Sequence, residues 1–165
     1  MAEKKVNVAI VGASGYSGEE LVRLLLEHPH VNLSVLTSRQ YAGQTMTSVF
    51  PRFEGYNHAS DLKFSSPSID ILSEKADVVF LALPHGIAAE FAVPLANKGV
   101  TVIDLSADFR INDAAIYKEF YGNEHPEPQW LTKAVYGLPE IHRAAIANAT
   151  LIASPGCYPT SILLP

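Results

Sequence analysis

A glycine-rich loop between a strand pattern and a helix pattern is the feature that most constrains how this chain folds. Residues 6–12 form a short β-branched run ending in glycine, which is typical of a buried parallel strand. Residues 17–28 carry an apolar stripe at helical spacing, which stops before Pro29. The loop between them has glycine at positions 12, 15 and 18. This order predicts an α/β fold that begins with a parallel strand.

The alternation of strand and helix patterns continues along the chain. Further strand patterns occupy residues 31–38, 77–84, 100–106 and 149–156, and an apolar helix pattern occupies residues 86–97 with Pro94 inside it. Residues 40–68 lack a clear period, so loops with a short strand near residues 62–64 are expected there. Because parallel strands need crossover connections, we predict a doubly wound, mostly parallel Rossmann-type sheet with helices on both faces.

The composition suits one compact globular domain. The chain has 165 residues, of which 48% are hydrophobic, and a net charge of -5. Its basic residues are scattered, and no apolar run approaches the roughly 18 residues of a membrane span. The N-terminus runs from a charged segment directly into a strand pattern, and one cysteine cannot form an internal disulfide. We therefore expect a cytoplasmic protein without a metal site, a nucleic-acid partner or a membrane partner.

The three glycines form a G-x-x-G-x-x-G variant of the dinucleotide-binding pattern. Glycines permit a tight turn and let backbone amides approach a pyrophosphate, while the helix N-terminus adds N–H donors and a favourable dipole. We expect a nucleotide here; the alternative is a glycine-rich turn without a ligand. The residues assigned to the cofactor in this loop are Gly12, Ser14, Gly15, Tyr16, Ser17 and Gly18.

The end of the second predicted strand indicates which nucleotide binds. NAD enzymes usually place an acidic residue about 20 residues after the glycines, where it accepts the ribose hydroxyls. Here no Asp or Glu occurs between Glu27 and Glu54, and the strand ends in Thr37, Ser38 and Arg39. Hydroxyls and a guanidinium suit the 2′-phosphate of NADP. NADP(H) is therefore the predicted cofactor, and the alternative for Arg39 is an ordinary solvated arginine.

Two further loops follow predicted strands and carry polar side chains. His85 is assigned to the cofactor, near the nicotinamide, although a histidine before a helix is also often a structural cap. Ser106 and Arg110 are assigned to a substrate phosphate, which a guanidinium can clamp, with Asp104 or Asp108 holding the loop. The alternative is a local Asp–Arg pair that only orders the turn.

The only cysteine, Cys157, lies in the stretch SPGCYP. Pro155 and Gly156 predict a sharp turn after the last strand, and Pro159 suits the first residue of a new helix. Beside a helix N-terminus a cysteine is favoured as the thiolate, and the same amides can stabilise an oxyanion. A cysteine thioester also accepts hydride from a redox cofactor. We therefore expect Cys157 to be the nucleophile; a buried, inert thiol is the alternative.

Five motifs stand out along the chain: VAIVGASGYSGEELVRLL, LALPHG, VIDLSADFR, YGLPE and ASPGCYPT. In order and spacing they resemble the N-terminal half of the N-acetyl-γ-glutamyl-phosphate reductase family, which is related to aspartate-semialdehyde dehydrogenase. The resemblance implies NADPH-dependent reduction of N-acetyl-γ-glutamyl phosphate to N-acetylglutamate semialdehyde and phosphate, in arginine biosynthesis. It places the nucleophile on Cys157, the pyrophosphate on residues 12–18, the 2′-phosphate on Ser38 and Arg39, and a phosphate contact on Arg110.

The resemblance also implies a second domain. In the family, the acid–base histidine and the oligomer interface lie in a C-terminal α+β domain, and none of the six histidines here falls in that motif. We expect residues 1–153 to form the NADP-binding domain and residues 154–165 to begin the second domain, which is largely absent from this chain. The complete enzyme is expected to be a homo-oligomer, a dimer or a tetramer. The chain alone is expected to bind NADP(H) with little or no turnover.

Two other functions remain compatible with the sequence. One is a stand-alone NADP-binding sensor or regulatory module without turnover, because a fold does not fix a function. The other is aspartate-semialdehyde dehydrogenase, which the residues around Cys157 match less well.

Overall fold

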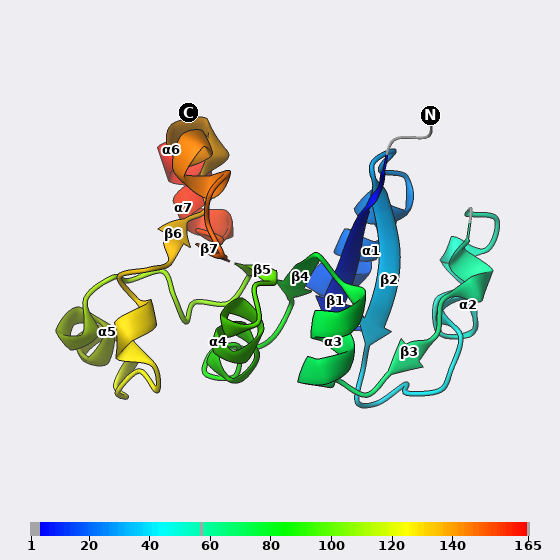
Figure 1. Ribbon diagram of the computed structural model, residues 1–165, viewed down its shortest axis with the longest axis horizontal. Helices are drawn as coiled ribbons and strands as arrows, with labels where there is room; N and C mark the ends of the chain where they lie inside the picture. Colours follow the sequence, from blue (N-terminus) through cyan, green and yellow to red (C-terminus); the bar gives the residue numbers. More distant parts are fainter. Residues whose placement is uncertain (1–3, 57, 165) are drawn as a thin grey trace. The chain divides into compact units, whose positions relative to one another are not determined.

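The computed structural model describes residues 4–56 and 58–164, and the chain divides into two compact units (Figure 1). The first unit comprises residues 1–82 and the second comprises residues 83–165. Strands and helices alternate in both units, which confirms the predicted α/β class.

The first unit holds the glycine-rich loop within a parallel sheet. Its described strands are β1 (Val6–Val11), β2 (Val31–Thr37), β3 (Phe64–Ser65) and β4 (Val78–Leu81). Its helices are α1 (Tyr16–Leu26), α2 (Met46–Val49) and α3 (Ile69–Lys75), with 3-10 helices at Pro51–Phe53 and Ala59–Asp61. The strands pair in parallel in the order β3-β2-β1-β4, which matches the first four positions of a doubly wound sheet.

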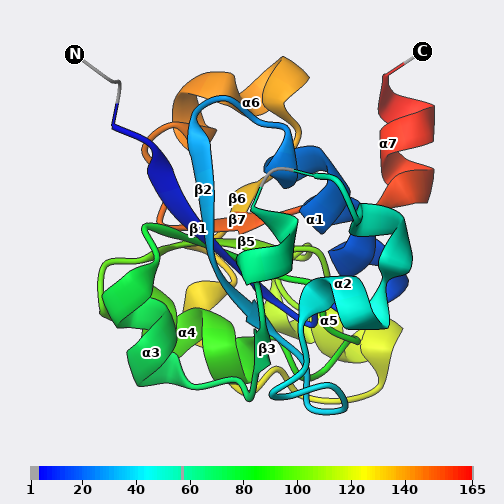
Figure 2. The ribbon, with the colours of Figure 1, turned by 90° about the vertical axis from the view of Figure 1, so that its right-hand side faces the viewer.

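Packing around β1 fixes one edge of this sheet. Helices α1 and α3 lie on opposite sides of β1 and β2, as Figure 2 shows. Ile10, Leu36 and Phe64 are buried in the core of the unit. Val11 pairs with Thr37 on one side and with Leu81 on the other. The carboxyl ends of the three strands therefore meet at the same edge.

The second unit holds the cysteine turn. Its described strands are β5 (Thr101–Asp104), β6 (Val135–Tyr136) and β7 (Leu151–Ala153). Its helices are α4 (Ala89–Asn97), α5 (Ala114–Tyr121), α6 (Pro139–Ile146) and α7 (Cys157–Leu163), with a 3-10 helix at Pro128–Trp130. Strand β7 pairs in parallel with both β5 and β6. Asp104 aligns with Ala153, so the loops after β5 and β7 leave the sheet at the same edge.

Several boundaries differ from the predicted ones. Helix α4 begins at Ala89 instead of residue 86, because Gly86 adopts a φ of +86° that a helix cannot continue. Pro94 lies inside α4. The last helix begins at Cys157, two residues before the predicted Pro159, so the cysteine is its first residue. Helices α2, α3 and α5 and the two-residue strand β6 were not predicted; β6 is too short to show an alternating pattern.

Candidate functional site

The structure gives a different explanation for each of the three glycines in the first loop. Gly12 has a φ of +83°, a conformation that L side chains rarely adopt. A Cβ on Gly18 would lie 2.2 Å from the Gly12 carbonyl oxygen and 2.6 Å from the Ala13 Cα, so α1 packs directly on the loop. Gly15 has a φ of -82°, and a Cβ there would meet only the Gly12 oxygen, at 3.6 Å. The fold therefore requires glycine at positions 12 and 18 but not at position 15.

The glycine loop is tied to the end of β2. The Ala13 N–H donates to the Thr37 carbonyl oxygen at 2.9 Å, and the Ser14 and Ser38 hydroxyls share a hydrogen bond of 2.8 Å. Ser38 is buried, and its hydroxyl also accepts a hydrogen bond from the Tyr41 N–H. Arg39 is exposed beside this junction. The structure thus joins the two segments that the sequence assigned to the pyrophosphate and to the 2′-phosphate.

The start of α1 can take an anionic ligand. Gly15 is its N-cap residue and provides no side-chain hydrogen bond, whereas Ser68 caps α3 and Asp113 caps α5. Gly15, Tyr16 and Ser17 are all exposed. An uncapped helix start with exposed amides matches a pyrophosphate, and the exposed space at Gly15 would be filled by a Cβ. These residues fit a nicotinamide dinucleotide.

In the second unit, the loop after β5 is organised by two buried carboxylates. Asp104 accepts hydrogen bonds from the Ser106 N–H at 2.9 Å and from the Ser106 hydroxyl at 2.7 Å. The Ser106 hydroxyl in turn accepts from the Asp108 N–H at 3.1 Å. Burial, the largest effect, raises the pKa of Asp104 to about 6, although the hydrogen bonds from Ser106 oppose it. Ser106 is therefore engaged within the loop.

Asp108 holds His85 in place. The fully buried Asp108 carboxylate accepts hydrogen bonds from the Gly86 N–H at 2.7 Å and the Ala89 N–H at 3.2 Å, at the start of α4. His85 Nδ1 lies 2.8 Å from the same carboxylate, and the His85 ring packs on Tyr121 at 4.4 Å between centroids. His85 thus orders the loop together with Asp108, and its side chain remains 39% exposed.

A second histidine, which the sequence did not single out, lies beneath this loop. His125 is buried between Phe109 and Tyr117, and its Nδ1 accepts a hydrogen bond from the Glu127 N–H. Burial lowers the pKa of His125 and raises the pKa of Tyr117 to about 12. No local pattern distinguishes this aromatic cluster, because its members come from separate segments.

Arg110 is half-buried and contacts the turn that precedes Cys157. The Arg110 Nε donates to the Ser154 carbonyl oxygen at 2.8 Å, and Nη2 donates to the Leu105 carbonyl oxygen at 2.9 Å. Both acceptors are main-chain oxygens of the loops that follow β5 and β7. Cys157, by contrast, is exposed at the first position of α7, so the alternative of a buried thiol does not hold.

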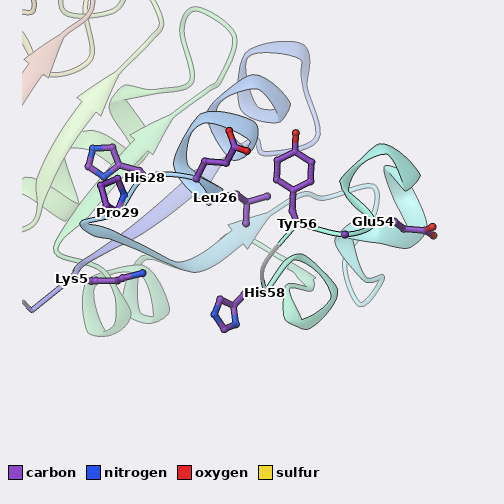
Figure 3. A pocket seen from close by; sticks show the side chains of 9 residues that line it. Lys5, Leu26, His28, Pro29, Glu54, Tyr56 and His58 are labelled. Atoms are coloured by element: carbon purple, nitrogen blue, oxygen red, sulfur yellow. The ribbon is translucent and has the colours of Figure 1, made fainter. Parts of the chain in front are cut away.

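A hollow of about 660 Å³ in the first unit contains none of the predicted site residues (Figure 3). Its lining includes Lys5, which precedes β1, and His28 and Pro29, which follow α1. These residues lie at the amino ends of β1 and β2, the opposite end of the strands from the glycine loop. This hollow is therefore separate from the predicted nucleotide site.

The described residues also bear on metal and membrane sites. No cluster of three or more His, Cys, Asp or Glu side chains able to hold a metal ion occurs in residues 4–56 and 58–164. None of the helices in that part of the chain combines the length and hydrophobicity that a bilayer crossing requires.

Comparison with protein families adds an independent line of information. The family model for the semialdehyde dehydrogenase NAD-binding domain matches residues 7–149. An N-acetyl-γ-glutamyl-phosphate reductase of Akkermansia muciniphila is 56% identical over 98% of this chain and 47% of its own length. A [LysW]-L-2-aminoadipate/[LysW]-L-glutamate phosphate reductase of Saccharolobus solfataricus is 51% identical over 97% of this chain and 45% of its own. The chain thus spans about half the length of these relatives.

Solved structures share the fold at lower identity. Aspartate semialdehyde dehydrogenase II of Vibrio cholerae gives a TM-score of 0.71 at 23% identity, over 97% of this chain and 44% of its own. Aspartate semialdehyde dehydrogenase of Candida albicans, solved with NADP, gives 0.54 at 18% identity, over 74% of this chain and 41% of its own. At these identities the likeness shows the fold alone.

Proposed function

Because the chain belongs to the semialdehyde dehydrogenase family through its NAD-binding domain, we propose that it is the cofactor-binding part of an NADPH-dependent acyl-phosphate reductase. The proposed reaction converts N-acetyl-γ-glutamyl phosphate to N-acetylglutamate semialdehyde and phosphate. One observation carries the proposal: the chain is 56% identical to a protein named N-acetyl-γ-glutamyl-phosphate reductase. The glycine loop at a helix start without a side-chain cap and the exposed cysteine are compatible with it. The proposal includes a place in arginine biosynthesis, in the cytoplasm, as a homo-oligomer.

The first unit holds the cofactor in this proposal. The exposed amides of residues 15–17 bind the pyrophosphate, and Gly15 keeps the space beside them open. Arg39, with Ser38 behind it, binds the 2′-phosphate, which gives NADP preference over NAD because no carboxylate stands at the end of β2. When bound, the cofactor supplies the hydride that reduces the acyl carbon.

Cys157 supplies the nucleophile. Its thiolate attacks the γ-acyl carbon, the bond from that carbon to the phosphate oxygen breaks, and phosphate leaves as a thioester forms on the sulfur. After the acyl carbon has been reduced, the carbon–sulfur bond breaks, which releases the aldehyde and returns the thiolate. One acyl phosphate, one hydride and one proton thus give one aldehyde and one phosphate. The proposal assigns the proton-transfer histidine to the second domain of the family, outside this chain.

A second candidate substrate follows from the other relative. The Saccharolobus solfataricus protein is named a phosphate reductase for LysW-linked 2-aminoadipate and glutamate, and it is nearly as similar, at 51% identity. The two names share reduction of a phosphate derivative and differ in the group attached to the amino acid. The acetylated substrate is preferred here because the relative of higher identity carries that name.

The reverse reaction tests this function. The complete reading frame that contains this sequence is incubated with N-acetylglutamate semialdehyde, phosphate and either NADP or NAD, and formation of the reduced cofactor is followed. We expect turnover with NADP and a loss of at least about a thousandfold in Cys157→Ser, since a serine hydroxyl is a far weaker nucleophile at neutral pH. A matched surface variant, Ser161→Ala on the same helix, should keep its activity.

Other outcomes would redirect the assignment. Turnover unaffected by Cys157→Ser would remove the nucleophile role from this residue. NADP binding without turnover in the complete protein would support the sensor module, and turnover only with a LysW-linked semialdehyde would support the second substrate. The isolated chain should bind NADP(H) with little or no reduction, which equilibrium dialysis and the same assay measure.

A further inference from the structure

Arg110 connects the two loops that surround the cysteine turn. Its guanidinium donates to the Leu105 oxygen, just after β5, and to the Ser154 oxygen, just after β7. At 2.8 and 2.9 Å, both contacts are well-formed hydrogen bonds from a charged donor. We propose that Arg110 is a positioning residue for Cys157, holding the turn before the sulfur instead of clamping a substrate phosphate. This proposal rests on the proposed function only for the identity of Cys157 as the nucleophile.

The geometry depends on an arginine fork. The two acceptors belong to different loops, so one side chain must present donors in two directions at once. A guanidinium carries five N–H donors in a rigid plane, whereas a lysine ammonium is a single point of charge on a flexible stem. A lysine at position 110 would therefore keep the charge but lose the bridge.

Gly156 shows how closely Arg110 packs on the turn. Its φ is +92°, and a Cβ built there would lie 2.7 Å from Nη1 and 2.9 Å from Cζ of Arg110. The guanidinium thus occupies the space that any other residue at position 156 would need. Because Cys157 is the next residue and the first of α7, a shift of this contact changes where the sulfur is presented.

The neighbouring Asp108 carboxylate bonds to groups other than Arg110. The Asp108 carboxylate is bound by His85 and by the amides of Gly86 and Ala89, and main-chain carbonyls accept the hydrogen bonds of Arg110. The alternative of a local Asp–Arg pair is therefore not what orders this turn, because main-chain oxygens accept these hydrogen bonds of Arg110. The bridge between two loops orders it.

Amide hydrogen exchange of this chain tests the positioning role without any substrate. In Arg110→Lys and Arg110→Met, peptides covering residues 150–160 should exchange at least about tenfold faster, because the bridge that limits local opening is gone. Gly156→Ala should do the same, since its Cβ displaces the guanidinium. The glycine loop, residues 10–20, and the matched surface variant Arg143→Met should be unchanged. Unchanged exchange at residues 150–160 in both Arg110 variants overturns the proposal.

Kinetics of the complete protein then separate positioning from phosphate binding. Loss of positioning should lower kcat by at least about thirtyfold in both Arg110→Lys and Arg110→Met, with the KM for phosphate changed less than about threefold. A phosphate clamp predicts the reverse: Arg110→Lys keeps most activity, and the KM rises at least about tenfold in Arg110→Met. Faster exchange in a complete protein that lacks reductase activity would reject the proposed function and leave the positioning of the turn supported.

Discussion

The glycine loop and the cysteine turn both follow the carboxyl ends of parallel strands, yet they expose different groups. At the glycine loop, the groups left for a ligand are main-chain amides, since α1 has no side-chain cap and residues 15–17 are exposed. In the second unit, these polar side chains contact other groups of the protein. Asp104 accepts hydrogen bonds from Ser106, Asp108 lies against His85, and Arg110 donates to two main-chain carbonyls. Cys157 is exposed at the start of α7.

This difference shows that charged residues in a loop after a strand can serve contacts within the protein. A run such as Asp104 to Arg110 looks rich in ligand-binding groups, but each of its carboxylates is buried and hydrogen-bonded. The glycine loop has no charged side chain among residues 12–18, yet its residues 15–17 are exposed at a helix start without a side-chain cap. The first region leaves main-chain amides exposed, whereas the second uses its charged side chains in contacts within the protein.

The largest effect is expected from Gly18→Ala, which removes the packing on which the glycine loop depends. Its Cβ would lie 2.2 Å from a backbone oxygen and 2.6 Å from a backbone carbon, which cannot move without shifting α1 off β1. We expect a loss of more than about 3 kcal/mol in the free energy of unfolding, measured by urea titration of the chain. A loss under about 1 kcal/mol would show that α1 adjusts and that Gly18 is not a packing requirement.

Asp104→Asn tests the buried network of the second unit. Because the folded-state pKa of Asp104 is raised to about 6 from 3.8, the native state holds a proton there that the unfolded state releases. Asp104 therefore lowers the free energy of unfolding progressively as the pH rises from about 4 to about 6. Above about pH 6 this loss of stability is nearly complete. The stability of the wild type relative to Asp104→Asn should fall by about 2 kcal/mol between pH 4 and pH 7.5.

The difference between the wild type and Asp104→Asn serves as its own control. Other titrating groups are present in both proteins, so their contributions cancel in the difference between the two urea titrations. An asparagine retains an oxygen to accept from the Ser106 N–H and an amide to donate to the Ser106 hydroxyl. A difference that does not vary with pH would mean that Asp104 titrates as an ordinary exposed carboxyl.

The sequence predicted the parts of the fold that have a local period. Strands β1, β2, β4, β5 and β7 and helices α1 and α4 appear near their predicted ranges, since each has an apolar run or stripe. Helix α5 was missed although Asp113 caps it and Gly122 ends it with a φ of +78°. Those two signals were in the sequence and define a helix with only one fully buried residue, Tyr117.

The site was predictable where its chemistry is local and not where it depends on long-range contacts. The glycine spacing and the end of β2 were identified from adjacent residues, and the structure joins them through Ser14 and Ser38. The partners of Asp108 and Arg110 were not, because His85 is 23 residues from Asp108 and Ser154 is 44 residues from Arg110. These contacts join residues that lie far apart in the sequence, so no local pattern indicates them.

Gly15→Ala should separate ligand binding from folding at the glycine loop. The backbone at Gly15 is extended, and its Cβ would make an ordinary contact of 3.6 Å, so the free energy of unfolding should fall by less than about 1 kcal/mol. The same Cβ would project where the amides receive a pyrophosphate, so NADP(H) affinity should fall at least about tenfold. Isothermal titration of the chain measures this affinity. Gly18→Ala is the comparison variant, because it is expected to affect folding instead of binding. Unchanged affinity would show that the pyrophosphate does not approach Gly15.

Arg39→Met gives the smallest expected change and tests which nucleotide the first region recognises. Arg39 is exposed, so its removal should not affect folding, and its charge-assisted contact to a 2′-phosphate should be worth about tenfold in NADP(H) affinity. NAD(H) lacks that phosphate, so its affinity should change less than about twofold, and the matched surface variant Arg23→Met should leave both affinities unchanged.

An equal loss for both cofactors would mean that Arg39 acts on the loop rather than on the phosphate. Tighter binding of NAD(H) than of NADP(H) by the unmodified chain would contradict the assignment of Arg39 to a 2′-phosphate, because NAD(H) has no phosphate at that position.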